Sequence, residues 1–119
     1  MVLRQRRDNY EYLRQCLDGI SALSFLWQEK TLSEGICPLG LPVIVGDRLR
    51  WWRKLTAAGV PVSRWWEGYH RRLDWSTFPE ARLLKDHLLL LPVHQNLTSY
   101  HMDYIADLVH ALALRHSRP

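Results

Sequence analysis

Histidine and aromatic side chains in the middle of the chain form the first group that could do chemistry. Trp66, Tyr69 and His70 stand within five residues of one another, beside Gly68, in a stretch that runs to Asp86. Aromatic rings stack on the faces of sugars and nucleobases, and an imidazole exchanges a proton near neutral pH. Long connections often carry function, so we predict ligand contacts here. The alternative is a surface loop whose rings are anchored in the core.

His94 is the second candidate for ligand binding. It follows an apolar run, Leu88 to Leu91, and Pro92, and it opens a polar turn. Loops at strand ends carry the sites of open α/β sheets. We therefore expect His94 and His70 to border a shared cleft if both segments lie at one end of the sheet. The alternative is a turn whose imidazole simply faces solvent.

The other reactive side chains match no known site. Six residues could ligate zinc in principle, but their spacings fit no zinc template: Cys16, Cys37, His70, His87, His94 and His101. A Cys–His nucleophilic pair is equally unsupported, because Cys16 lies on an apolar helix face and is expected in the core. We predict no metal site and no catalytic residue.

Composition favours one globular domain over residues 1–119. The chain is 47% hydrophobic and 24% charged, which is typical of a domain with a sizeable core. It contains no apolar run of 18 residues, so no membrane span is predicted. Two cysteines are too few for a disulfide framework. A reduced, cytoplasmic protein is the expectation.

The net charge of +4 would permit an anionic partner. Basic residues cluster only at Arg4 to Arg7 and at Arg48 to Lys54, and a solvated basic face explains both clusters. The second cluster lies in a helix that is expected between strands, which argues against a helix-turn-helix. We therefore do not expect nucleic acid as a partner.

The first predicted element is a long N-terminal helix from Val2 to Asp18. Its apolar residues follow helical spacing, and Gly19 supplies a stop signal; they are Leu13, Cys16, Leu17 and Ile20. The segment from Ser24 to Trp27 could begin a strand.

A strand–helix–strand unit is predicted from Leu41 to Trp65. Two prolines in the β-rich run Cys37 to Val45 favour an edge strand, or a strand that begins at Leu41. Asp47 is a good N-cap for a helix from Arg48 to Ala58, with Gly59 behind it. The next strand is expected at Val60 to Trp65. We expect Leu49, Trp52 and Leu55 to face inward and Trp51 to be partly exposed.

The remaining elements are a short helix at Pro79 to Lys85, a strand at His87 to Leu91, and a final helix capped by Thr98 or Ser99. The inner face of that helix is predicted from its periodicity: Met102, Ile105, Val109 and Leu112, with Ala106 and Ala113 beside them. This order predicts a small α/β (α+β) two-layer sandwich, in which helices pack on a mixed or antiparallel sheet.

Several of these segments resemble the C-terminal small domain of DegT-type sugar aminotransferases, which are pyridoxal-phosphate enzymes of fold type I. RRDNYEYLRQCL resembles the helix that links the two domains of those enzymes, where an Arg-rich turn precedes Asn and an aromatic residue. LPVHQNLT resembles their Leu-Pro-x-His/Tyr-x-x-Leu/Met-Ser/Thr signature. The resemblance implies that the segment from Trp65 to His70 faces the substrate.

The resemblance also implies what is missing. The family's catalytic lysine and the residues that hold the cofactor ring and phosphate belong to a large domain, and none of their motifs occurs here. Lys30, Lys54 and Lys85 are the only lysines, and none matches the lysine motif. We therefore expect no cofactor in the isolated chain, although the complete enzyme would use pyridoxal phosphate. The expected partner is a large domain or a homo-oligomer. The chain would be a fragment or a component of a split enzyme; the alternative is a non-catalytic ligand- or protein-binding module.

Overall fold

The computed structural model describes residues 2–25, 32, 38–63 and 86–116. Three helices and three strands lie in these ranges: α1 (Val2–Cys16), β1 (Leu23–Phe25), β2 (Gly40–Val45), α2 (Arg48–Ala57), β3 (Leu88–Pro92) and α4 (Ser99–His116). Among the described residues, no helix has the length and apolar character that crossing a membrane requires.

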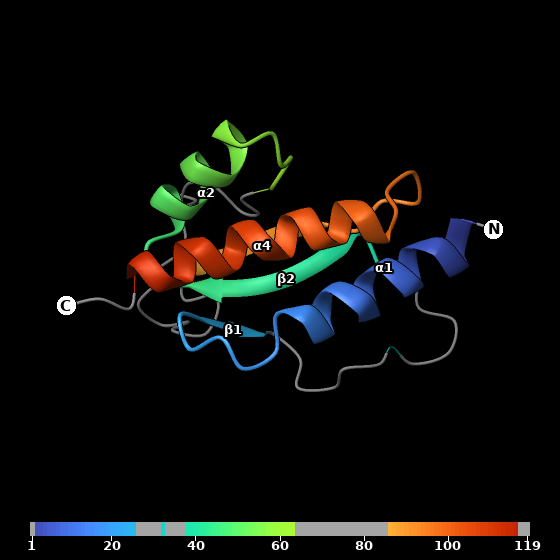
Figure 1. Cartoon of the computed structure of the whole chain (residues 1–119), viewed down its shortest axis with the longest axis horizontal. Coiled ribbons are helices and arrows are strands. Elements are labelled where there is room, and N and C mark those ends of the chain that lie inside the picture. The colour runs from blue at the N-terminus through green and yellow to red at the C-terminus, as the bar shows by residue number, and fades with distance from the viewer. Residues whose placement is uncertain (1, 26–31, 33–37, 64–85, 117–119) are drawn as a thin grey trace, which may run out of the picture.

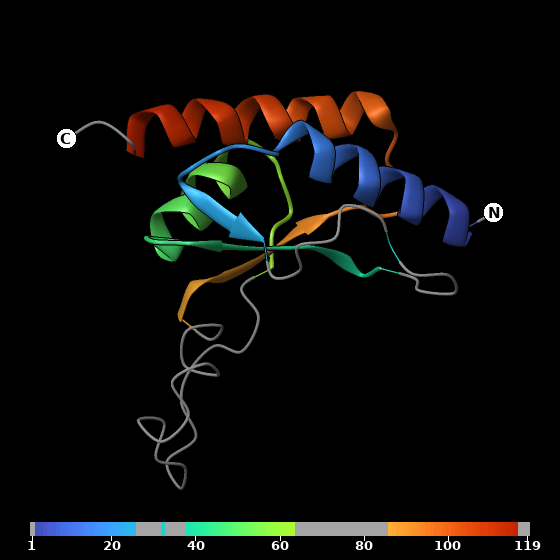
Figure 2. The same cartoon turned by 90° about the horizontal axis from the view of Figure 1, so that it is seen from below.

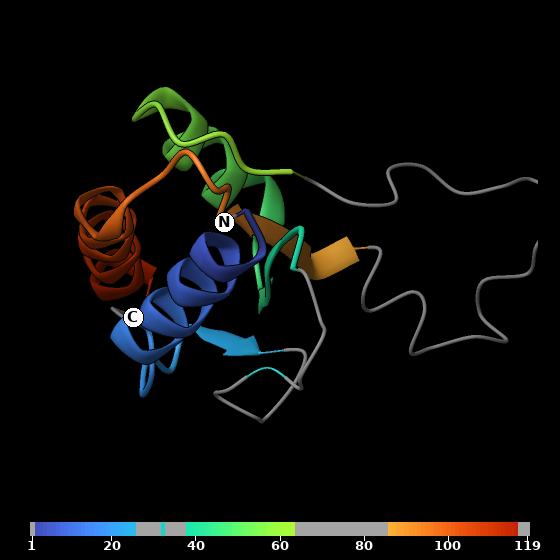
Figure 3. The same ribbon diagram turned by 90° about the vertical axis from the view of Figure 1, so that its right-hand side faces the viewer.

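The strands form one antiparallel sheet in the order β1-β2-β3. Leu23 pairs with Val45 at one edge, and Gly40 pairs with Pro92 at the other. The helices cover one face of this sheet, with α4 lying between α1 and α2 (Figures 1 and 2). An end-on view shows the same two layers (Figure 3). The predicted two-layer α/β sandwich with a long N-terminal helix is confirmed.

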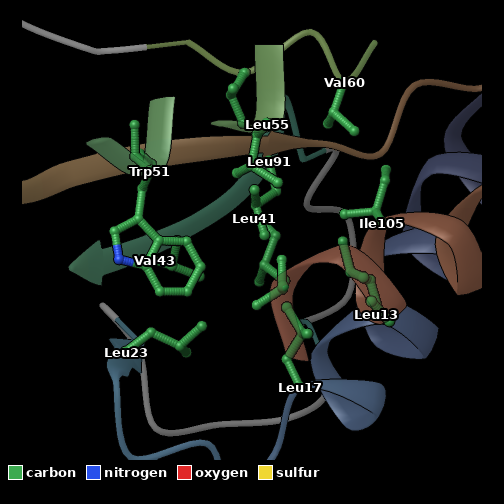
Figure 4. Packing of buried hydrophobic residues seen from close by; sticks show 14 of the residues in the cluster. Leu13, Leu17, Leu23, Leu41, Val43, Trp51, Leu55, Val60, Leu91 and Ile105 are labelled. Carbon is green, nitrogen blue, oxygen red and sulfur yellow. The ribbon is translucent and has the colours of Figure 1, made fainter. Parts of the chain in front are cut away.

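The core lies between the sheet and the helices. Alternate residues of a strand face opposite sides of a sheet, so Leu41, Val43 and Val45 of β2 all point toward the helices. Leu13 and Leu17 of α1 and Ile105 of α4 meet them (Figure 4). The predicted inner face of α4 is buried as expected: Met102, Ile105, Ala106, Val109, Leu112 and Ala113.

The inner face of α2 differs from the prediction. Trp51 is only 2% exposed and Leu55 is buried, whereas Leu49 is 44% exposed and Trp52 is only partly buried. Residues four apart share a helix face, so Trp51 and Leu55 together define the buried side. Trp51 reaches into the core beside Val43 and Leu23 (Figure 4). The N-cap prediction is confirmed, because the Asp47 carboxylate accepts a bond from the Arg50 N–H at 3.2 Å.

Two strand predictions are wrong in part. The described residues after α2 form a single bridge between Ser63 and Leu90 rather than a strand from Val60. For the run that contains the two prolines, the edge alternative is wrong, because Pro42 lies in the central strand, while the alternative of a strand that begins at Leu41 agrees to within one residue with β2, which begins at Gly40. Proline is tolerated there because β1 reaches only as far as Val43 along β2, which leaves Pro42 with β3 as its partner among the described strands.

Three glycines stand where the backbone requires this residue type: two at predicted positions after helices and one where two strands lie close together. Gly19 and Gly59 have φ values of 85° and 89°, the left-handed region in which side chains are strained. Each follows the end of a helix, as predicted. Gly40 is different: a Cβ there would lie 2.5 Å from Leu90 Cγ and 2.8 Å from the Leu91 carbonyl oxygen. Only glycine lets β2 and β3 come together at this end of the sheet.

Candidate functional site

The turn that carries His94 connects β3 to α4. The Leu97 N–H donates to the His94 carbonyl at 2.9 Å, which closes the turn. The Asn96 N–H donates to Nδ1 of His94 at 3.2 Å, so the imidazole accepts at Nδ1. The His94 side chain is exposed. Its position is therefore set by the turn, while its Nε2 edge can approach a ligand.

Asn9 of α1 holds this turn in place. It is 2% exposed, and its Nδ2 donates to the carbonyls of His94 at 3.0 Å and Leu97 at 2.9 Å, with a third contact to Val93 at 3.4 Å. Buried carbonyls need such donors. The Asn9 side chain thus adds a second donor to the His94 carbonyl, which already accepts from the Leu97 N–H, and it supplies a donor to the Leu97 carbonyl.

Two neighbours of Asn9 on α1 extend the same clamp. Gln5 Nε2 donates to the side-chain oxygen of Asn9 at 3.0 Å and to the Leu97 carbonyl at 2.9 Å. Arg6 Nε donates to Oε1 of Gln95 at 2.6 Å. One helix face therefore fixes both ends of the turn. These bonds bring the Arg-Asp-Asn-Tyr segment of α1 and the Leu-Pro-Val-His segment together in the fold.

A pocket of about 380 Å³ opens beside His94. Its lining is mostly apolar: Leu39, Pro61, Ser63, Leu90, Leu91, Pro92, Val93, His94 and Leu97. The Ser63 hydroxyl and the His94 imidazole are its polar side chains. Such a pocket can hold an apolar or ring-shaped group and orient it with one or two hydrogen bonds.

The other predicted site residues, Trp66, Tyr69 and His70, lie outside the described residues. Their meeting with His94 in one cleft stays a prediction. The described residues contain no group of three or more metal-ligating side chains.

Sequence reasoning missed Asn9 and Ser63 as site residues. Asn9 stands next to Tyr10 and four residues before Leu13, so it belongs to the apolar face of the helix. A polar residue on an apolar face indicates a buried hydrogen bond. Ser63 carries no signal of this kind, because its role comes from pairing with Leu90, 27 positions later, through bonds of 3.2 Å and 3.0 Å.

Tyr12 and Cys16 form a small electrostatic cluster between α1 and α4. The Tyr12 hydroxyl donates to the Asp103 carboxylate at 2.5 Å, and this bond is the main reason that the pKa of Tyr12 is raised to about 12. Burial, together with the charges of Asp103 and Asp107, raises the pKa of the Cys16 thiol. A thiol that holds its proton is a poor nucleophile.

Solved structures share the fold of this chain. Sugar aminotransferase CalS13 from Micromonospora echinospora matches with a TM-score of 0.72 and 21% identity, over 92% of this chain and 30% of its own. Aminotransferase TlmJ from Streptoalloteichus hindustanus matches with a TM-score of 0.75 and 22% identity, over 97% and 32%. A DegT DnrJ EryC1 StrS aminotransferase from Brucella abortus matches with a TM-score of 0.72 and 15% identity, over 94% and 31%.

The chain has the fold of part of a sugar aminotransferase. The resemblance predicted from its segments is thereby confirmed at the level of the fold. The chain spans about 30% of the length of these enzymes. No family model matches its sequence, and a search of curated proteins gives no significant match.

The pocket beside His94 does not fit the cofactor of such an enzyme. A Spr1654 structure from Streptococcus pneumoniae, described as a sugar aminotransferase, has been solved in its PLP-form. Binding of this kind needs a lysine with a lowered pKa and groups that hold a phosphate. Lys54 lies exposed on α2, while Lys30 and Lys85 lie outside the described residues. The pocket beside His94 contains neither lysine nor arginine.

Proposed function

We propose that this chain is the small domain of a sugar-aminotransferase-like enzyme and is not catalytic alone. It would act with a large domain that carries the catalytic lysine. The observation that carries the proposal is the extent of the fold match. Nearly all of this chain superposes on about 30% of three aminotransferases, with TM-scores of 0.72 to 0.75.

The turn from Val93 to Thr98 would form one wall of the enzyme's substrate site. The Asn9 clamp supports this, because a site needs side chains held by a rigid second layer. His94 would donate or accept a hydrogen bond at a sugar hydroxyl, and the apolar pocket would hold a ring face. Trp66, Tyr69 and His70 are proposed as further substrate contacts. We propose a cytoplasmic setting, in which the free thiol of Cys16 stays reduced.

Pyridoxal phosphate would be held by the large domain. The chain's own contribution is binding and orientation of the sugar, together with exclusion of water from the side of the site that the turn covers. Lys54 lies on an exposed helix face, which supports the assignment of cofactor binding to the large domain and of sugar binding to this chain.

Co-purification tests the proposal. The protein encoded directly upstream should carry the lysine domain, and the two should purify as a stoichiometric complex when they are produced together. In that complex, His94→Ala should raise KM for a nucleotide sugar about tenfold, because a hydrogen bond in a binding site is worth about 1.4 kcal/mol. Asn96→Ala, an exposed side chain of the same turn, is the matched control and should leave KM unchanged. The absence of both an upstream lysine domain and a complex would contradict the proposal.

A second candidate is a non-catalytic module that binds an apolar group. It is favoured by the character of the pocket beside His94, where Leu39 is 70% exposed and the lining carries no carboxylate, lysine or arginine. Titration of the chain with nucleotide sugars, observed through its imidazole NMR resonances, separates the two candidates. Resonances that do not move would favour the module.

A further inference from the structure

Two histidines where β3 leads into α4 accept hydrogen bonds from the backbone. Nδ1 of His94 accepts from the Asn96 N–H at 3.2 Å, and Nδ1 of His101 accepts from the Thr98 N–H at 3.0 Å. A backbone N–H can only donate, so Nδ1 carries no proton in either ring. Each of these imidazoles is therefore neutral, with its proton on Nε2.

The bond to His101 caps α4. Thr98 directly precedes the helix, its carbonyl accepts from the Met102 N–H at 3.1 Å, and His101 is the third helical residue. Glu or Gln at that position closes a capping box. The Thr98 hydroxyl lies 3.1 Å from the same Nδ1 and adds a second donor. The imidazole supplies the acceptor of a capping box only while it is neutral, since a protonated ring has two donors and no acceptor.

The other two histidines whose side chains the structure describes have the opposite role. Nδ1 of His87 lies 2.9 Å from the Val45 carbonyl oxygen, and Nε2 of His110 lies 2.9 Å from that of Cys16. A carbonyl oxygen can only accept, so these ring nitrogens donate and keep their bonds when the ring gains a proton. Of these four histidines, acid therefore opposes the hydrogen bonds of only the two that flank the turn.

We propose that the turn from Val93 to Thr98 is a pH-sensitive switch, which holds the His94 ring near neutral pH and releases it in acid. An unperturbed imidazole changes its charge between about pH 8 and about pH 5. A proton on Nδ1 of either ring would face a backbone N–H, so that donor meets donor. The ring must then rotate away, and the N–H of Asn96 or Thr98 loses its partner. A positive charge in the first turn of α4 is also unfavourable, because the helix dipole is positive there.

Charged side chains of both signs stand on the helices around the turn. They are Arg6, Asp8 and Glu11 on α1, Asp103 on α4, and Lys54 on α2. Arg6 bonds the Gln95 side chain, and the two carboxylates of α1 line the pocket that includes Thr98. The cations oppose a charged imidazole and the carboxylates favour it. Strands β2 and β3 and the pocket beside His94 carry no charged side chain. Because these charges oppose one another, the two backbone donors decide the direction of the switch.

The release is local. The Asn9 amide does not titrate, so its bonds to the carbonyls of His94 and Leu97 persist in acid. Acid therefore frees the His94 ring and the first turn of α4, while the backbone of the turn stays attached to α1. A sugar held by His94 would bind more weakly in acid; this consequence rests on the proposed function, whereas the switch itself does not.

Urea unfolding of the full chain at about pH 7.5 and about pH 5 tests the proposal with the variant His94→Asn/His101→Gln. Asn accepts the N–H two residues on in an Asx-turn, Gln closes a capping box, and neither side chain titrates. Between the two pH values, the urea midpoint of the natural chain should fall by about 1 M more than that of the variant. In the natural chain near neutral pH, imidazole nitrogen NMR should place the ring proton of both histidines on Nε2.

His110→Gln is the matched control, because it removes an exposed histidine of α4 whose ring donates. Its urea midpoint should fall in acid at least as far as that of the natural chain. Three results would overturn the proposal: acid-induced falls that differ by less than about 0.3 M between the natural chain and the double variant, a control that loses the acid sensitivity, or a ring proton on Nδ1 of either histidine near neutral pH. The chain is measured alone and without ligand, so these results are separate from those of the co-purification.

Discussion

Asn9 offers the sharpest test of how the site is built, because one side chain holds the turn that carries His94. Asn9→Asp keeps the shape of the side chain but replaces the donor Nδ2 with an oxygen. The carbonyls of His94 and Leu97, now bonded at 3.0 Å and 2.9 Å, would face an acceptor instead. The substitution creates no cavity, so the loss of stability reports on the lost donor and on the burial of a carboxylate that faces two carbonyls.

The expected loss follows from those two bonds. Two net hydrogen bonds of about 1 kcal/mol each are lost, and the buried carboxylate oxygen that faces the two carbonyls costs about 1–3 kcal/mol. The substitution should therefore lower the free energy of unfolding by about 3 kcal/mol. Small domains have about 5–15 kcal/mol in total. With a urea dependence of about 1.5 kcal/mol per molar, the unfolding midpoint should fall by about 2 M.

Urea unfolding followed by tryptophan fluorescence measures this change. Gln15→Glu is the matched control, since it makes the same amide-to-carboxylate change on an exposed position of α1; it should shift the free energy of unfolding by less than about 0.5 kcal/mol. Our description of the clamp would be refuted if Asn9→Asp were as mild as the control. It would also be refuted if the destabilised variant kept the imidazole resonances of His94 unchanged.

Three further substitutions test the packing and the charges of the fold. Gly40→Ala should destabilise the chain by about 1–3 kcal/mol through overpacking, whereas Gly46→Ala, where a Cβ meets nothing within 4 Å, should be near neutral in the same urea assay. Trp51→Ala should cost about 3–5 kcal/mol and Trp52→Ala clearly less; equal losses would contradict the burial of the first ring. The hydroxyl of Tyr12 should ionise with a pKa of about 12 rather than at its ordinary value of 10.0. The measurement is the absorbance at 295 nm as a function of pH, with the curve of Tyr12→Phe subtracted from that of the natural chain. Because the unfolded chain loses this proton first, stability should fall as the pH rises from about 10 to about 12.

Local signals in the sequence predicted much of the fold. The helical spacing of Leu13 and Leu17, the Asp47 cap and the glycine after α2 each depend on neighbours within a few residues. They were found correctly, and so was the two-layer arrangement. The inner face of α2 was wrong because Trp51 and Trp52 are adjacent and equally apolar. Which ring is buried depends on the direction in which α2 crosses the sheet, and that is a property of the tertiary structure.

Contacts between segments that are distant in the chain could not be predicted from the sequence. The bonds from Asn9 to the turn span more than 80 residues, and no local pattern encodes them. The sequence predicted His94 as a site residue, and this stays a prediction; the structure places His94 exposed beside a pocket. The predicted roles of Trp66, Tyr69 and His70 stay predictions.

Borohydride trapping tests the central claim most directly, namely that this chain is the non-catalytic small domain of a sugar-aminotransferase-like enzyme. The chain would be mixed with pyridoxal phosphate, reduced, digested and mapped by mass spectrometry, with and without the protein encoded upstream. We predict no stoichiometric label on any lysine of the isolated chain, and one labelled lysine on the partner when both are present. Stoichiometric labelling of Lys30, Lys54 or Lys85 in the chain alone would contradict the claim.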